Sequence, residues 1–311
     1  MQPDDVRAPT ERSTALRGVA NHGRAALLGL ALLIATTVGA TFAQQELSEP
    51  ARIAYQEARD AMQRAIDADV APYPDQPLWA EAIRKAREAV DAAPNDRRTL
   101  GLLAEVYSRS TFHARALNAW HAYLTRDYLL DAVQAPLFLE VSEEMAYAAY
   151  QRGNLQEAAR IHMEVLDAVP FSKESRVWIA RIRMEQERPV DAIPYWEAVV
   201  AQDPEDRRAA YFLALAEDQV RFGIEAADRF RAGVAHYEAG DLDAAARSFE
   251  RATEANDGYA EAWAWRGRVA FERGSYLVAQ RHYATAADLS PGNDSYVYFR
   301  NESQRRRGAQ D

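Results

Sequence analysis

The chain of 311 residues contains no cysteine, and this absence removes several classes of site. No disulfide can form, no thiol nucleophile or cysteine metal ligand exists, and no N-terminal cysteine is available for lipid attachment. Lysine is nearly missing as well, since Lys85 and Lys173 are the only two, so arginine carries almost all the positive charge. The formal net charge of −10 argues against general binding to nucleic acid or to anionic lipid.

The motifs of catalysis and of metal binding are missing too. No two histidines have the spacing of a metal-binding helix, and there is no Gly-rich phosphate loop. The six histidines are scattered over the leader and different predicted helices: His22, His113, His121, His162, His236 and His282. For His162 and His282 we expect packing in or near the core. The sequence therefore predicts no enzyme, no cofactor and no metal site.

Only one long apolar run is present, and it lies near the N-terminus. Arg17 and Arg24 precede an uncharged run over 25–40, which is followed by the small-x-small sequence Thr41-Phe42-Ala43. This order is typical of a secretory signal peptide, here residues 1–43, cleaved after Ala43. A retained membrane anchor is the alternative, because residues 25–45 form an uncharged stretch of 21 residues that could span a bilayer. With either outcome we expect an exported protein, periplasmic or in the cell envelope, or anchored in the inner membrane and facing outward.

The second half of the chain has a period of 34 residues. Gly267, Gly274, Ala279 and Tyr283 repeat, 34 positions earlier, as Gly233, Gly240, Ala245 and Phe249. Gly-Asn, Gly-Asp and Gly-Ser pairs at 153–154, 240–241 and 274–275 place a helix-ending glycine beside an N-cap residue. Prolines at 94, 170, 204 and 291 end each unit. A period of this length predicts stacked helix pairs, none of which can bury its apolar face alone.

These residues resemble the tetratricopeptide repeat (TPR). The resemblance covers residues 97–293 well and 50–95 loosely, with small residues such as Ala104, Ala146 and Ala180 at its eighth position. It implies an all-α solenoid of helix-turn-helix units wound into a right-handed superhelix. Five to six helix pairs are expected.

The chain departs from the repeat in several places. Pro-rich residues 71–78 form a stiff insertion in the first unit, and a second insertion lies around 127–137. Pro194 is interpreted as a residue of a first helical turn capped by Asp191. Residues 207–221 form an extra helix without an obvious partner helix, where we expect a bend. The sequence thus divides into a leader, N-terminal repeats over 47–206, a junction at 207–223, C-terminal repeats over 224–293, and a capping segment with a frayed basic tail over 294–311.

The first helix of each unit has one row of residues that is buried against its neighbours and a second row beside it. In the TPR family this second row lines the concave face that binds the ligand. Two units carry nearly the same residues in this second row, since Trp178 and Arg181 correspond to Trp265 and Arg268. The predicted partner-binding residues are Glu105, Arg109, Tyr147, Gln151, Val177, Trp178, Arg181, Glu185, Tyr237, Trp265, Arg268 and Phe271. Aromatic anchors beside charged groups suit a peptide site. They are equally compatible with packing between helices and with Arg–Glu pairs that stabilise their own helix.

The sequence therefore predicts an exported, non-catalytic scaffold that binds a protein or peptide in a concave groove, with no nucleic acid and no small-molecule cofactor. A membrane-anchored or self-associating structural component of the envelope, whose groove is filled by its own insertions, is the alternative. An enzyme or glycan-processing accessory would need clustered carboxylates with perturbed pKa values.

Overall fold

The computed structural model describes residues 46–309, and the predicted signal peptide lies outside them. The described residues form fourteen α-helices and no strand, which confirms the all-α prediction. The helices are α2 (Glu49–Asp67), α3 (Pro77–Ala92), α4 (Arg97–Arg109), α5 (His113–Leu124), α6 (Gln134–Gln151), α7 (Leu155–Ala168), α8 (Lys173–Glu185), α9 (Pro189–Gln202), α10 (Arg207–Phe222), α11 (Ile224–Glu238), α12 (Leu242–Ala255), α13 (Ala260–Glu272), α14 (Tyr276–Leu289) and α15 (Asp294–Gly308).

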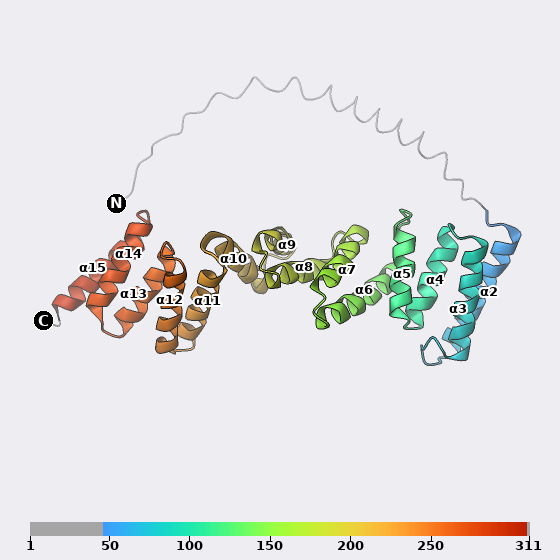
Figure 1. Ribbon diagram of the computed structural model, residues 1–311, viewed down its shortest axis with the longest axis horizontal. Helices are drawn as coiled ribbons and strands as arrows, with labels where there is room; N and C mark the ends of the chain where they lie inside the picture. Colours follow the sequence, from blue (N-terminus) through green and yellow to red (C-terminus); the bar gives the residue numbers. More distant parts are fainter. Residues whose placement is uncertain (1–45, 310–311) are drawn as a thin grey trace, which may run out of the picture.

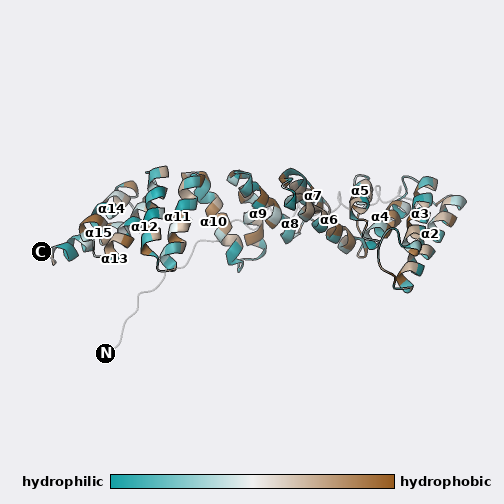
Figure 2. Ribbon diagram, turned by 60° about the horizontal axis from the view of Figure 1, so that its bottom comes forward, coloured by the Kyte–Doolittle hydropathy of each residue, from teal (hydrophilic) through white to brown (hydrophobic). Residues whose placement is uncertain are grey.

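The helices stack in chain order into one elongated array, with α2 at one end and α15 at the other (Figure 1). Six antiparallel pairs make up the array: α2/α3, α4/α5, α6/α7, α8/α9, α11/α12 and α13/α14. We call the first helix of each pair helix A and the second helix B. Most helices carry both hydrophobic and hydrophilic residues (Figure 2), so each has an apolar side to bury against its neighbours.

The turns within pairs follow from glycine and N-cap chemistry, as the sequence predicts. Gly153, Gly240 and Gly274 have φ values of 73°, 79° and 73°, a left-handed conformation that glycine adopts without the Cβ clash of other residues. Asn154 and Asp241 each accept a hydrogen bond from a backbone N–H of the helix that follows. Ser275 occupies the N-cap position of α14, as predicted, although its side chain makes no capping hydrogen bond.

Close approach of helix A to helix B depends on a small residue at the eighth repeat position. A Cβ atom on Gly233 would lie 2.6 Å from two ring carbons of Phe249, and one on Gly267 would lie 2.9 Å from the ring of Tyr283. Both distances are below van der Waals contact, so each glycine lets an aromatic ring of helix B lie directly on the backbone of helix A.

Gly233→Ala is expected to lower the free energy of unfolding by about 1–3 kcal/mol, because overpacking outweighs the helix propensity gained with alanine. Urea unfolding followed by circular dichroism measures this. Gly308→Ala is the matched control, since nothing lies within 4 Å of its added Cβ. Equal stability of the two variants would contradict the close approach.

Three details of the helix boundaries differ from the sequence prediction. Pro194 lies inside α9, which begins at Pro189, because that earlier proline takes the first-turn position. The first insertion ends before Pro77, since Gln76 caps α3 through its side chain. The second insertion contributes its last residues to α6, which begins at Gln134.

The extra helix α10 has no helix B of its own, as the sequence predicts, but both of its neighbours in the chain pack on it. It packs on α9, where Ala209 and Ala216 share a core with Trp196, and the rings of Trp196 and Phe212 stack with centroids 5.3 Å apart. α10 thus takes the place of a helix A without a helix B. A single residue, Gly223 with a φ of 91°, joins it to α11. The bend expected at this position remains a prediction.

The contact between α10 and α11 includes two polar interactions. Arg231 forms an ion pair with Asp218 at 2.5 Å, and the side-chain amide of Gln219 donates to Asp228 at 2.7 Å. An apolar contact adds to these, since the ring of Phe222 stacks on that of Tyr259 with centroids 3.8 Å apart. Polar and apolar contacts therefore both join the helices before and after Gly223.

The C-terminal segment is a complete helix, α15, which packs on α14. Phe299 stacks on Tyr283 with centroids 5.4 Å apart, as expected of a helix that covers the last pair. The basic run is not frayed, because Arg305 and Arg306 lie within the helix and both pair with Glu302.

Candidate binding groove

Two clusters of side chains, mostly from the A helices, have nearly the same composition and similar contacts. The N-terminal aromatic cluster comprises Tyr150, His162, Trp178, Arg181 and Glu185, and the C-terminal aromatic cluster comprises Tyr237, Phe249, Trp265, Arg268 and Glu272. Each member of the second lies 87 positions after its counterpart in the first (265 − 178 = 87). The repeated sequence therefore corresponds to a repeated arrangement of side chains in space.

In the N-terminal aromatic cluster, Trp178 of α8 is the central side chain. It stacks on His162 of α7 with ring centroids 5.8 Å apart, and the Arg181 guanidinium lies 4.8 Å from its ring. Tyr150, from α6 of the preceding pair, contacts its edge at 5.1 Å. The Tyr150 hydroxyl donates to the Glu185 carboxylate at 2.6 Å, and this hydrogen bond raises the pKa of the tyrosine.

The C-terminal aromatic cluster reproduces these contacts around Trp265 of α13. Its ring stacks on Phe249 at 5.4 Å and meets Tyr237 at 5.0 Å. The Arg268 guanidinium lies 4.8 Å from both the Trp265 and Tyr237 rings, and its Nε donates to the Tyr237 hydroxyl at 2.9 Å. That hydroxyl donates to Glu272, and burial together with this bond raises the pKa of Tyr237.

Both tryptophans therefore pack within their own chain and are partly buried. Arg268 and Glu185 stay exposed at the surface, while Arg181 is partly covered. The clusters join α8 and α13 to the helix pair that precedes each of them. Use of these residues to bind a partner remains a prediction.

The other predicted residues lie outside the two clusters. Glu105 and Arg109 pair with each other on α4 at 2.8 Å, as the packing interpretation expects. Phe271 packs on Tyr276 of the next helix with centroids 5.2 Å apart. Gln151 is exposed at the end of α6, and Val177 is partly buried in α8.

The structure brings Tyr147 to the edge of Trp178, with ring centroids 6.2 Å apart, and leaves 49% of the tyrosine exposed. These two rings line an open hollow of about 500 Å³ between α6 and α8. Its other lining residues are all carboxylates: Glu143, Glu144 and Glu174. We call this the acid–aromatic hollow.

Sequence reasoning missed the participation of Glu144, Glu174 and His162. The two glutamates lie on the same side of their helices as Tyr147 and Trp178, but 30 residues separate them (174 − 144 = 30), so only the stacking of one helix pair on the next brings them together. His162 was expected in the core. It is 3% exposed, and burial lowers its pKa to about 4.

Within residues 46–309, no group of three or more histidine, aspartate or glutamate side chains is arranged to hold a metal ion. In the same part of the chain, no helix is both long enough and apolar enough to cross a bilayer.

Comparisons with known proteins add a family match. The family model described as Tetratricopeptide repeat matches residues 179–220 and 230–294, which include most of α8–α10 and α11–α14. No protein of curated function matches the sequence.

Among solved structures, a tetratricopeptide repeat protein from Parabacteroides merdae ATCC 43184 is 12% identical, covers 81% of this chain and 99% of its own, and has a TM-score of 0.36. YrrB, a "TPR protein with an unusual peptide-binding site", is 17% identical over 68% of this chain and 96% of its own, with a TM-score of 0.29. The pilF protein of Pseudomonas aeruginosa is 16% identical over 80% of this chain and 99% of its own, with a TM-score of 0.30.

Proposed function

This chain is a tetratricopeptide repeat protein, and from that premise we propose that it is a non-catalytic scaffold whose A helices bind a segment of a partner protein. Proteins of this family typically act through protein interactions. The observation that supports this proposal most directly is the acid–aromatic hollow, where the half-exposed Tyr147 ring lies beside Trp178 and charged groups on adjacent A helices. Exposed aromatic side chains flanked by charged groups are typical of peptide-binding surfaces.

We also propose that the scaffold works outside the cytoplasm, in the cell envelope. The basic flank, the apolar run and the small residues before Gln44 support export. N-terminal sequencing of the protein from its own cells would find Gln44 after cleavage, and an uncleaved N-terminus would instead favour the membrane anchor.

A photo-crosslinking residue in place of Tyr147 tests the groove, with the full-length chain in its own cells. The matched control carries the same residue at Leu277, which is 43% exposed but lies on a B helix, α14. We expect a discrete protein adduct from position 147 and none from position 277. Adducts from the control position alone, or from neither position, would contradict binding by the A helices.

A self-associating structural component is the second candidate. Its premise that the insertions fill the groove finds no support at the acid–aromatic hollow, since no insertion residue lines it. The first insertion instead accepts a hydrogen bond at Pro72 from Thr111, and in the second, Tyr128 donates to the backbone of Asn95. An adduct of the chain with itself from position 147 would favour this candidate.

A further inference from the structure

We propose that the acid–aromatic hollow receives a lysine or arginine side chain of the partner segment. This inference rests on the proposed function and adds the chemistry of the ligand. The hollow combines three carboxylates with two aromatic rings in about 500 Å³, a volume within the range of pockets that take up ligand groups.

The carboxylates of the hollow have no cation of their own. In the described part of the chain, no arginine, lysine or histidine lies within ion-pair distance of Glu143, Glu144 or Glu174. Burial, followed by the charges of Glu174, Glu144 and Glu140, raises the pKa of Glu143. Charges of one sign gathered on a partly covered surface repel one another, and an incoming cation relieves that repulsion.

The rings of the hollow fit the rest of a basic side chain. Lysine and arginine have an apolar stem that packs on aromatic surface, while the charged end remains beside polar groups. Half of the Tyr147 surface is free for such packing, and a cation over its face gains cation–π attraction. Trp178 is held in place by His162 and Arg181, so binding of a ligand costs little conformational entropy at this side chain.

The C-terminal half of the chain shows that the fold does not need Glu143 and Glu144. The positions 87 residues after these two glutamates hold Phe230 and Arg231, whereas the position 87 residues after Glu174 again holds a glutamate, Glu261. The counterparts of the two α6 glutamates are thus apolar and basic, and Arg231 is paired with Asp218. Since the aromatic cluster forms with either set of residues, packing of that cluster does not explain Glu143 and Glu144.

Selection from a displayed library of random twelve-residue peptides, with the full-length chain as bait, tests the proposal. The best peptide is then measured against the wild type and against the triple variant Glu143→Gln, Glu144→Gln, Glu174→Gln. The matched control is Asp91→Asn, Glu197→Gln, Asp288→Asn, which removes three exposed, unpaired acids from B helices.

We expect selected peptides to share a lysine or arginine, at least tenfold weaker binding to the triple variant, and less than twofold weaker binding to the control. Replacement of the shared basic residue by glutamine should cost as much as the triple variant does. The triple variant should also melt at the same or a higher temperature, because repulsion is removed, so its loss of binding is not a loss of fold.

Peptides without a shared basic residue, or equal binding to the wild type and the triple variant, would overturn the cationic ligand while peptide binding itself stands. Failure to select any peptide would count against the proposed function and the inference together.

Discussion

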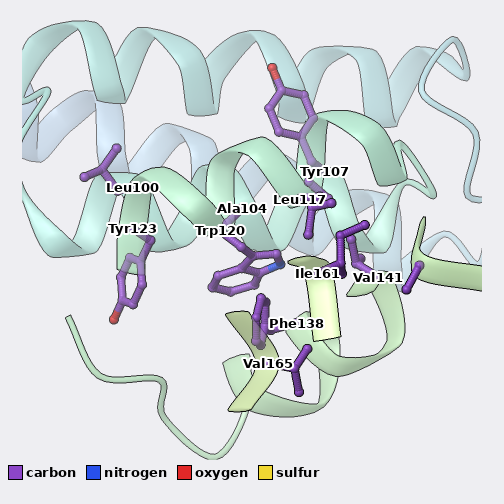
Figure 3. Packing of buried hydrophobic residues seen from close by; sticks show 12 residues of the cluster. Leu100, Ala104, Tyr107, Leu117, Trp120, Tyr123, Phe138, Val141, Ile161 and Val165 are labelled. Atoms are coloured by element: carbon purple, nitrogen blue, oxygen red, sulfur yellow. The ribbon is translucent and has the colours of Figure 1, made fainter. Parts of the chain in front are cut away.

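Replacement of Trp120 by alanine is expected to lower the free energy of unfolding by about 3–5 kcal/mol, the range for deletion of a fully buried large aromatic side chain. Trp120 is 0% exposed and belongs to a core built from four helices, α4 to α7 (Figure 3). Its ring meets Tyr123 and Phe138 edge-on at 5.9 and 6.2 Å, and its Nε1 donates to Ser108 at 2.9 Å. The variant leaves a cavity and a buried hydroxyl without this partner.

The loss should be local, because in a solenoid each unit contacts only its neighbours. Hydrogen exchange measured by mass spectrometry should show faster exchange in α4–α7 and unchanged exchange in α11–α15. Trp263→Ala is the control at a partly exposed tryptophan and should cost less. Equally faster exchange along the whole chain would show that the array unfolds as one cooperative unit.

His162→Phe is expected to make the chain less sensitive to acid. Burial holds the pKa of His162 at about 4, below its ordinary 6.5, so the folded state favours the neutral ring. Between these values the unfolded chain binds more protons than the folded chain, and stability therefore falls as the pH drops from 6.5 toward 4. The full shift corresponds to about 3 kcal/mol at pH 4.

The chain itself supplies the replacement, because Phe249 occupies the corresponding position of the C-terminal aromatic cluster and stacks on Trp265 in the same way. Urea unfolding at pH 7 and at pH 4.5 should show a smaller stability loss for the variant than for the wild type. His113→Phe provides a control at a different histidine. If the variant and the wild type lost the same stability between these pH values, the buried neutral imidazole would not be a source of acid sensitivity.

The repeat pattern predicted the fold because its signals are local. Gly153, Gly240 and Gly274 are needed where a helix must end with a positive φ, and the sequence places an N-cap residue directly after each. Pro194 shows where such signals are ambiguous, since Pro189 offers a second possible helix start five residues earlier.

The candidate site was less predictable because its contacts join different units. The residues shared by the units of Trp178 and Trp265 were visible in the sequence. The tyrosine that completes each cluster, Tyr150 or Tyr237, comes from the preceding helix pair and bonds across to the next one. The acid–aromatic hollow depends on the distance between α6 and α8. The repeat pattern does not specify that distance, because an insertion precedes α6. Distances between units follow from packing and not from periodicity.

The position of α10 has a consequence for how this array can change in length. α10 covers the apolar side of α9 as α15 covers that of α14. α10 also joins the helices that follow it, through the Arg231–Asp218 ion pair and through Phe222, which packs on the core of Phe230 and Tyr259. A shortening of the chain that removed α10 or α15 would therefore uncover an aromatic ring of a helix B, Trp196 or Tyr283.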